Sequence, residues 1–301
     1  MRKIDQLCHA FIAVHLPSAG HLRLISSVIR VNILLERIGD YAVTIAREAV
    51  QLGEAPEGRM LKDLETISAE AISTLSESIS AFNSSNAERA RDAIAMAGKI
   101  EREMDGIYAE LLDSAEGNGG CSRDTMIYLI IFSQLKRVAD QAKNLAEQTV
   151  FIETGETKAP KVYRILFLDE DNSCLGPMAE MIADKIYPDI GEYTSAGVHP
   201  ADSLNASMAE FMQQRGFNVS AIAPRQLDSN RESLAHYHVI VGLHQKVLKA
   251  VIKIPFRTSA LTWKDVEIPK SDDAEAWETL HKTLALHIRE LMTLLRGDEG
   301  V

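Results

Sequence analysis

Apolar residues recur every three or four positions through the first half of the chain, the spacing that places them on one face of an α-helix. Turn residues separate three long segments that follow this pattern. We therefore predict helices over residues 57–84, 88–113 and 122–153. Proline occurs only at Pro17 and Pro56 among the first 150 residues, so this half can be entirely helical.

The pattern changes after a polar stretch, residues 155–160, that contains both glycine and proline. Beyond it, short apolar runs of strand length alternate with helical segments, an order typical of a parallel α/β sheet. The predicted strands are residues 163–168, 219–222 and 239–242, and the predicted helices are residues 177–184, 201–215 and 274–296. We therefore expect a multidomain chain, with a helical domain over residues 1–155 and an α/β domain over residues 162–297.

Part of the helical half is repeated 100 residues later in the chain. Residues 35–46 align with residues 135–146, and residues 2–7 align with residues 102–107 at the same offset. Because two helices and their connection recur together, the alignment indicates a duplicated structural unit.

The two copies of this unit differ in length. The second copy, residues 57–153, contains three predicted helices, whereas the first, residues 1–52, begins inside the second helix of its unit. We expect the apolar face from Ile4 to Val14 to lack its covering helix. Either the true start lies further upstream or another surface covers this face.

Each copy carries two acidic residues four positions apart, which places both on one helix face. The pairs are Glu36 with Asp40, and Glu101 with Asp105. On neighbouring helices they would form an oxygen-rich site for a cation in the bundle core. A solvated helix face with ordinary ion pairs explains the same spacing, so the residue types leave both interpretations open.

Charge and composition exclude several classes of function. The 32 lysine and arginine residues against 43 aspartate and glutamate residues give a net charge of −11, so we expect no nucleic-acid partner. The longest apolar run, residues 126–132, is far shorter than the ~20 residues that span a bilayer. Cys8, Cys121 and Cys174 lack the spacing of a zinc site or a disulfide framework. We expect a cytoplasmic protein that meets the membrane only through partners.

Two segments of the helical half resemble the PhoU family of phosphate-uptake regulators. The sequence from Pro17 to Arg23, followed by residues 35–42, is similar to the first family signature, and residues 137–140 are similar to the second. The resemblance covers residues 1 to about 155 and implies two three-helix bundles, the first of them truncated here. It also implies contacts with the ATPase of a phosphate ABC transporter and with a sensor histidine kinase. A homodimer is a further expectation.

Carried over residue by residue, the family's metal motif implies two acidic sets for a divalent or ferric ion, Mg, Mn, Fe or Zn. The first set is Asp5, Glu36 and Asp40, and the second is Glu101, Asp105 and Asp140. Met1 stands where the acidic partner of Asp5 belongs. Lys136 replaces the glutamate partner of Asp140, which brings an ammonium group to a cation site.

Residues 163–296 resemble the low-molecular-weight tyrosine phosphatase and arsenate reductase family. The resemblance rests on residues 165–180, 195–200 and 216–220. In that family a C-x5-R loop follows the first strand. Its cysteine thiolate attacks phosphorus, and its arginine binds the phosphoryl oxygens.

Both catalytic positions of that loop are changed here, because Asp169 takes the nucleophile position and Leu175 takes the arginine position. Asn172 is suited to organising the turn, and Cys174 occupies the second, non-nucleophilic cysteine position of some members. The acidic run of residues 169–171 would repel a phosphate dianion. We therefore predict a degenerate loop and a pseudophosphatase.

The resulting hypothesis is a non-catalytic negative regulator of phosphate transport and phosphate-responsive signalling, joined to a degenerate phosphatase-like domain. Alternatives are an active low-molecular-weight phosphatase or arsenate reductase, and a metal-binding helical bundle. A receiver-like domain is a further alternative, since an acidic run follows the strand at residues 163–168. It would need a phosphate-accepting aspartate at the end of a later strand, and residues 219–222 and 239–242 do not supply one.

Overall fold

The chain divides into two compact units, Met1–Ala159 and Pro160–Val301. The computed structural model describes residues 2–117, 122–158, 161–244, 246–251, 254–269 and 273–296. Each unit has a hydrophobic core of its own. The first is helical and the second is a parallel α/β domain, as the sequence pattern predicts. Cys121 lies outside the described residues.

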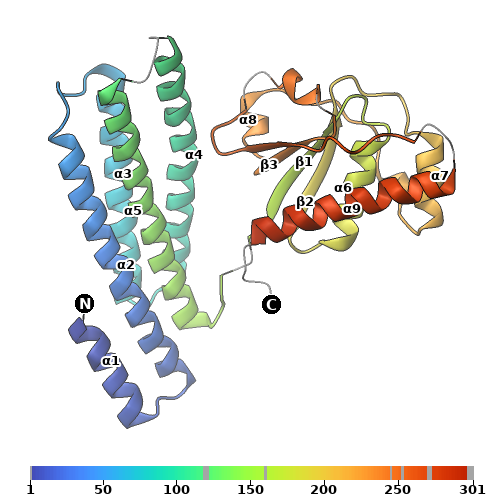
Figure 1. The fold of residues 1–301 in the computed structure, drawn as a ribbon. Helices are drawn as coiled ribbons and strands as arrows, with labels where there is room; N and C mark the ends of the chain where they lie inside the picture. The colour runs from blue at the N-terminus through green and yellow to red at the C-terminus, as the bar shows by residue number, and fades with distance from the viewer. Residues whose placement is uncertain are drawn as a thin grey trace. The chain divides into compact units, whose positions relative to one another are not determined.

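The described part of the first unit consists of long helices (Figure 1). They are α1 (Arg2–His15), α2 (Ala19–Ala49), α3 (Gly58–Asn83), α4 (Ala87–Gly117) and α5 (Arg123–Thr154). The three helices predicted for the second copy of the repeat are confirmed as α3, α4 and α5, with ends shifted by a few residues. Helix α5 packs against α2, α3 and α4, while α1 packs along the first part of α2.

Helix α5 is central because its sequence buries residues on several sides. At its start, Ser122 accepts the backbone N–H of Thr125, which is the usual way to cap a helix. It ends at Gly155, whose φ of 77° lies in the left-handed region that favours glycine. Along α5, Phe132 and Ala142 are fully buried. A helix with apolar residues all round can support neighbours on each face.

The second unit is a four-stranded parallel sheet with helices on both faces. Its elements are β1 (Tyr163–Asp169), α6 (Leu175–Ile186), β2 (Gly191–Gly197), α7 (Ala206–Gln214), η1 (Val219–Ala221), α8 (Arg231–Leu234), β3 (Val239–Gly242), η2 (Val247–Ala250), β4 (Ser259–Thr262) and α9 (Ala274–Arg296). The strand order is β2-β1-β3-β4. In the register, Asp169 pairs with Gly197 of β2, and Leu168 pairs with Gly242 of β3.

Strand β1 is buried on both faces, as expected for the centre of a parallel sheet. Ile165 and Phe167 join the core cluster formed with α6 and α9, and Leu166 and Leu168 join a separate cluster on the other face. The carboxyl end of β1 is thereby held from both sides.

One predicted strand is wrong, and two observed strands, β2 and β4, were not predicted. Residues 219–222 contain the 3₁₀ helix η1 instead of a strand, and Pro224 lies shortly after it. A segment of only four residues does not by itself distinguish a strand from a helical turn. Strands β2 and β4 are the two edges of the sheet, and the Ser-Ala-Leu-Thr sequence of β4 has only exposed or partly buried side chains. Edge strands carry a weaker hydrophobic signal than central ones.

Within the described ranges, no helix combines the length and the apolar character needed to cross a membrane.

Candidate functional site

In the loop at the carboxyl end of β1, a buried carboxylate accepts hydrogen bonds from backbone N–H groups. Asp169 is 4 % exposed. Its Oδ1 accepts the backbone N–H of Glu170 at 2.8 Å, and its Oδ2 accepts that of Gly176 at 3.1 Å. Free N–H groups at the start of a helix form a ready site for an anion. Here N–H groups of this loop and of the first turn of α6 are bonded to the protein's own carboxylate.

The charge state of Asp169 reflects opposing effects. Burial raises the pKa of its carboxyl, and this effect is the largest. The backbone N–H groups of Gly176, Glu170 and Leu175 lower the pKa, while the nearby charge of Asp171 raises it. The net pKa lies above the ordinary value for an aspartate, so ionised Asp169 carries a desolvation cost that the loop amides offset only in part.

Cys174 does not have the properties of a nucleophile. Its side chain is fully buried. Burial, helped by the charges of Asp169 and Asp171, raises the pKa of the thiol to about 12. Reactive cysteines are thiolates in electropositive, accessible surroundings, and Cys174 has neither property. It is protonated at neutral pH.

Leu175 brings no charge to the loop. Its side chain is buried and belongs to the core cluster beneath α6, together with Met178 and Ala179. The guanidinium of Arg225 forms an ion pair with Glu180, which lies on the same helix as Leu175, α6. The position where the resemblance implies an arginine therefore contributes to packing.

Two backbone features hold the loop in this shape. Asn172 adopts a φ of 52°, in the left-handed region that asparagine tolerates better than most residues. A Cβ at Gly197 would lie 2.9 Å from the backbone nitrogen of Asn172 and 2.9 Å from the carbonyl carbon of Asp171, so only glycine allows this approach.

Asn172 is fully buried, and its side-chain nitrogen and oxygen have no hydrogen-bond partner among the described residues.

A polar network that the sequence did not reveal anchors α6 to β2 close to the loop. Glu180, which is 5 % exposed, accepts the N–H of Ser195 at 2.7 Å and its hydroxyl at 2.6 Å. Arg225 donates to the other carboxylate oxygen of Glu180. These residues are far apart in sequence and form no motif, so no local signal identifies them.

The structure distributes the six predicted metal ligands over four helix segments. Asp5 lies on α1 and accepts a hydrogen bond from Asn32 at 3.3 Å. Glu36 and Asp40 are exposed on α2. No group of three histidine, cysteine, aspartate or glutamate side chains suited to a metal ion was found among the described residues. Met1 lies outside them.

A lysine side chain lies among the carboxylates of the second predicted set. Glu101 and Asp105 lie on α4, and Asp140 lies on α5. The Lys136 ammonium is 2.7 Å from Asp140 Oδ2 and 4.0 Å from Glu101 Oε1. The residues therefore do not fit a metal ion at this point, because an ammonium group stands between the two carboxylates. A metal ion on the helical unit remains a prediction from the acidic spacing and the family resemblance.

Replacing Lys136 with glutamate is expected to create a cation site, because it removes the ammonium and adds a third carboxylate beside Glu101 and Asp140. Added Mn²⁺ should raise the melting temperature of the variant and leave that of the wild type unchanged. The matched control is Lys62→Glu, the same charge change on the exposed face of α3. A wild-type chain that takes up stoichiometric Mn²⁺ would contradict this prediction.

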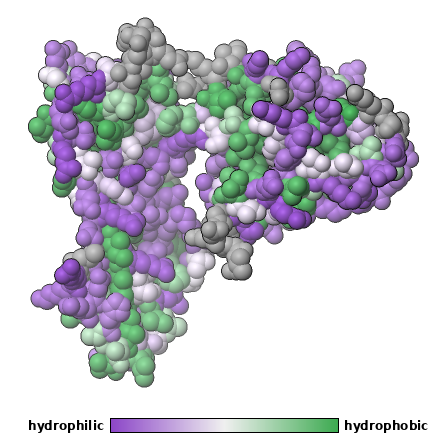
Figure 2. Space-filling model, viewed as in Figure 1, coloured by the Kyte–Doolittle hydropathy of each residue, from purple (hydrophilic) through white to green (hydrophobic). Residues whose placement is uncertain are grey.

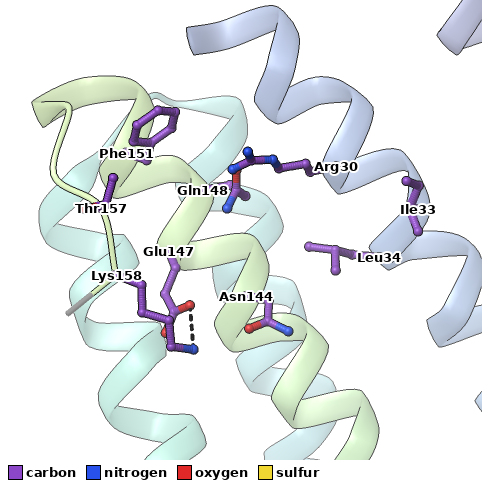
Figure 3. Close-up of a pocket in the computed structure, with 9 residues that line it drawn as sticks. All are labelled: Arg30, Ile33, Leu34, Asn144, Glu147, Gln148, Phe151, Thr157 and Lys158. Atoms are coloured by element: carbon purple, nitrogen blue, oxygen red, sulfur yellow. Dashed lines mark hydrogen bonds and ion pairs between the residues drawn. The ribbon is translucent and has the colours of Figure 1, made fainter. Parts of the chain in front are cut away.

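A cavity of about 580 Å³ lies between α2, α5 and the segment that follows α5 (Figure 3). Its lining residues are Arg30, Ile33, Leu34, Asn144, Glu147, Gln148, Phe151, Thr157 and Lys158. The charged residues already have partners, since Lys158 pairs with Glu147 at 3.0 Å and Arg30 donates to Gln148 at 3.4 Å. The cavity is therefore lined by apolar side chains on one side and, on the other, by polar side chains that include these two pairs. No sequence motif predicted it.

Two family models match the chain. The PhoU domain model matches residues 2–49 and 64–149, and the model named low molecular weight phosphotyrosine protein phosphatase matches residues 164–298. Each match covers one of the two structural units.

Curated relatives are similar to the first unit. The phosphate-specific transport system accessory protein PhoU homolog of Pseudomonas aeruginosa is 30% identical over 157 residues, covering 51% of this chain and 64% of the relative. The protein of the same name from Synechocystis sp. is 26% identical over 162 residues, covering 52% and 69%. The chain spans about 64% of the length of the Pseudomonas aeruginosa relative.

Solved structures similar to each unit are also known. The crystal structure of PhoU from Pseudomonas aeruginosa is 30% identical, with a TM-score of 0.49, and the alignment covers 52% of this chain and 75% of that one. The Erwinia amylovora tyrosine phosphatase AmsI is 15% identical, with a TM-score of 0.38, and the alignment covers 46% and 97%.

Proposed function

Since this chain carries a PhoU domain in its N-terminal half and a low-molecular-weight phosphotyrosine protein phosphatase domain in its C-terminal half, we propose that it is a non-catalytic negative regulator of phosphate uptake and of phosphate-responsive signalling. Its first unit is the regulatory module. Its second unit keeps the phosphatase fold and has a degenerate loop, so it serves as a recognition or positioning domain.

The observation that carries this proposal is the carboxylate of Asp169 inside the loop. A phosphatase of this fold needs a thiolate to attack phosphorus and a guanidinium to bind its oxygens. In this chain a carboxylate already accepts the N–H groups of Glu170 and Gly176, and a leucine packs where the guanidinium belongs. A phosphate dianion would meet Asp169 and Asp171, and the Coulomb repulsion between charges about 4 Å apart is on the order of 4 kcal/mol at an effective dielectric of about 20.

The proposed partners follow from the first unit. The curated relatives are named accessory proteins of phosphate-specific transport systems. We infer that this chain contacts the ATPase of a phosphate ABC transporter at the cytoplasmic side of the membrane. The sensor histidine kinase rests on the family resemblance alone. Neither contact requires a chemical step by the second unit.

The test is an Asp169→Ala variant compared with the wild type in two assays. Purified wild-type chain is expected to release no product from p-nitrophenyl phosphate or arsenate above background, and the variant should be the same. In cells that lack their own PhoU-type regulator, expression of either chain should lower phosphate uptake to the same extent. Both readouts should be unchanged because Asp169 is proposed to have no catalytic role.

The matched control is Glu170→Ala, which removes a neighbouring carboxylate that is exposed. Turnover by the wild type that disappears in Asp169→Ala and survives in Glu170→Ala would establish an active phosphatase or arsenate reductase. Phosphate uptake that does not respond to the wild-type chain would contradict the regulatory half of the proposal.

A further inference from the structure

The cavity between α2, α5 and the segment that follows α5 has the size of a small-molecule site. Its volume of about 580 Å³ lies within the range of about 300–1,000 Å³ that is usual for pockets that hold small organic ligands. The lining runs from Arg30 to Lys158, so the cavity belongs entirely to the first unit. None of the six predicted metal ligands lines it. A site here is therefore separate from the predicted metal motif.

The apolar part of the lining can hold the body of an organic ligand. Leu34 of α2 and Phe151 of α5 are half-buried and line the cavity from two different helices. Figure 3 shows the Leu34 side chain directed from α2 toward α5. A ligand that covers these side chains gains about 25 cal/mol for each Å² of apolar surface removed from water. An aromatic ligand gains further from contact with the ring of Phe151.

The polar part of the lining presents hydrogen-bond donors. Gln148 Oε1 accepts the hydroxyl of Ser27 at 3.2 Å and a guanidinium N–H of Arg30 at 3.4 Å. Because both contacts use the oxygen, the side-chain nitrogen of Gln148 can donate to a ligand. Asn144 lies one turn earlier on the same face of α5, and its side chain makes no hydrogen bond within the described ranges. Two amide donors are therefore available to a ligand in the cavity.

The charge of the lining is positive. Glu147 and Lys158 form an ion pair at 3.0 Å, so these two charges balance each other. Arg30 is exposed, and within the described part of the chain its side chain is hydrogen-bonded to the neutral amide of Gln148 and not to a carboxylate. A guanidinium carries five N–H donors and binds the oxygens of an acidic group, often through two parallel hydrogen bonds. The lining therefore combines one unbalanced positive charge with amide donors.

We propose that this cavity binds a small aromatic anion, an organic molecule with a ring system and one phosphate, carboxylate or sulfonate group. The acidic group lies against Arg30, and the amides of Asn144 and Gln148 donate to it or to polar atoms beside it. The ring packs on Leu34 and Phe151. The ligand binds and is released without a chemical step. This inference goes beyond the proposed function, because it assigns a small-molecule ligand to the first unit whether or not the second unit is catalytic.

The test titrates 8-anilinonaphthalene-1-sulfonate, a fluorescent aromatic anion, into the full chain. Arg30→Gln is expected to raise the Kd of this probe at least about tenfold, because the charge-assisted hydrogen bonds to the sulfonate are lost. The matched control is Arg37→Gln, the same charge change at an exposed position of α2 that does not line the cavity. It should change the Kd by no more than about twofold.

The comparison of the two arginine variants also separates the cavity from other apolar surface. The probe adheres to exposed apolar side chains, and Figure 2 shows hydrophobic surface where α1 and the first turns of α2 lie. Binding to that surface does not need the guanidinium of Arg30. The part of the fluorescence that Arg30→Gln removes and Arg37→Gln retains therefore reports on the cavity.

A second variant, Asn144→Asp, tests the amide donors with almost no change in side-chain volume. It replaces an N–H donor by a carboxylate and places a negative charge beside the acidic group of the ligand, so it should weaken the probe as Arg30→Gln does. Its matched control is Gln213→Glu, the same chemical change at an exposed position of α7. Circular dichroism should show the same helix content in the wild type and in all of these variants.

Competition for the probe distinguishes the sources of the ligand. Displacement by adenosine monophosphate would assign a nucleotide, and displacement by indole-3-acetate would assign an aromatic carboxylate. Adenosine and inorganic phosphate, which each carry only half of the required chemistry, should not displace the probe at the same concentrations. Equal binding by the wild type and Arg30→Gln, or equal losses for Arg30→Gln and Arg37→Gln, would overturn the proposal. Displacement by adenosine or phosphate alone, or by none of these compounds, would also overturn it.

Discussion

Replacing Glu180 with alanine is expected to lower the free energy of unfolding of the second unit by about 2–5 kcal/mol. The carboxylate of Glu180 accepts two hydrogen bonds from Ser195, which is fully buried. Alanine would leave the N–H and the hydroxyl of Ser195 without an acceptor and away from water. Such a loss costs about 1–3 kcal/mol for each buried group.

Losing the ion pair with Arg225 is expected to cost less free energy of unfolding than losing the hydrogen bonds with Ser195. Its side chain is 42% exposed, so water can solvate the guanidinium when its partner is removed. Glu180→Gln should lower the free energy of unfolding less than Glu180→Ala does, because glutamine keeps one acceptor oxygen for Ser195.

The measurement is urea unfolding followed by tryptophan fluorescence. Both tryptophans, Trp263 and Trp277, lie in the second unit, so the signal reports on that unit alone. Glu192→Ala, on the exposed face of β2, is the matched control and should change the free energy by no more than about 0.5 kcal/mol. Equal losses for Glu180→Ala and Glu192→Ala would show that the network near the loop does not stabilise the domain.

Replacing Leu111 with alanine is expected to destabilise the first unit by about 2–5 kcal/mol, the usual cost of truncating a buried leucine. Leu111 lies on α4, is 5 % exposed and belongs to the core cluster with Phe132 and Tyr108. The neighbouring residue, Leu112, is 38 % exposed. The two leucines share a helix and a local sequence, so they differ chiefly in burial.

Unfolding of the first unit is followed by circular dichroism, because its described residues are mainly helical and it contains no tryptophan. Leu111→Ala should shift the helical transition to lower urea and leave the tryptophan transition of the second unit in place. Leu112→Ala should shift neither by more than about 0.5 kcal/mol. A similar shift for both variants would mean that α4 is oriented differently from the described structure.

Local sequence pattern predicted much of the fold because the long helices follow one period for many turns. The predicted ends of α3, α4 and α5 differ from the observed ends by a few residues. The apolar period shows that a helix is present, whereas caps such as Ser122 and Gly155 decide the residue at which it begins or ends. Prediction failed for the 3₁₀ helix η1 and for the edge strands β2 and β4, whose structure depends on neighbours far away in sequence.

The candidate sites also have some features that the sequence revealed and others that only the structure revealed. The changed loop from Asp169 to Leu175 was visible in the sequence because its residues are contiguous. The sequence also showed Lys136 in place of an acidic residue. It could not show that Asp169 accepts the loop amides, that Glu180 is bound to Ser195, or that a cavity lies between α2 and α5.

By itself, the sequence determined the two-domain organisation, the internal repeat and the presence of Asp169 and Leu175 in the loop after β1, because each is written in contiguous residues or a regular period. Only the tertiary structure decided which side chains are buried together and which faces remain open. Ile4 and Met104 are both apolar at matching repeat positions, yet the first is 42 % exposed and the second is 0 % exposed. The physical reason is that burial depends on the element packed above a residue, and α3 packs against α4, the helix that carries Met104.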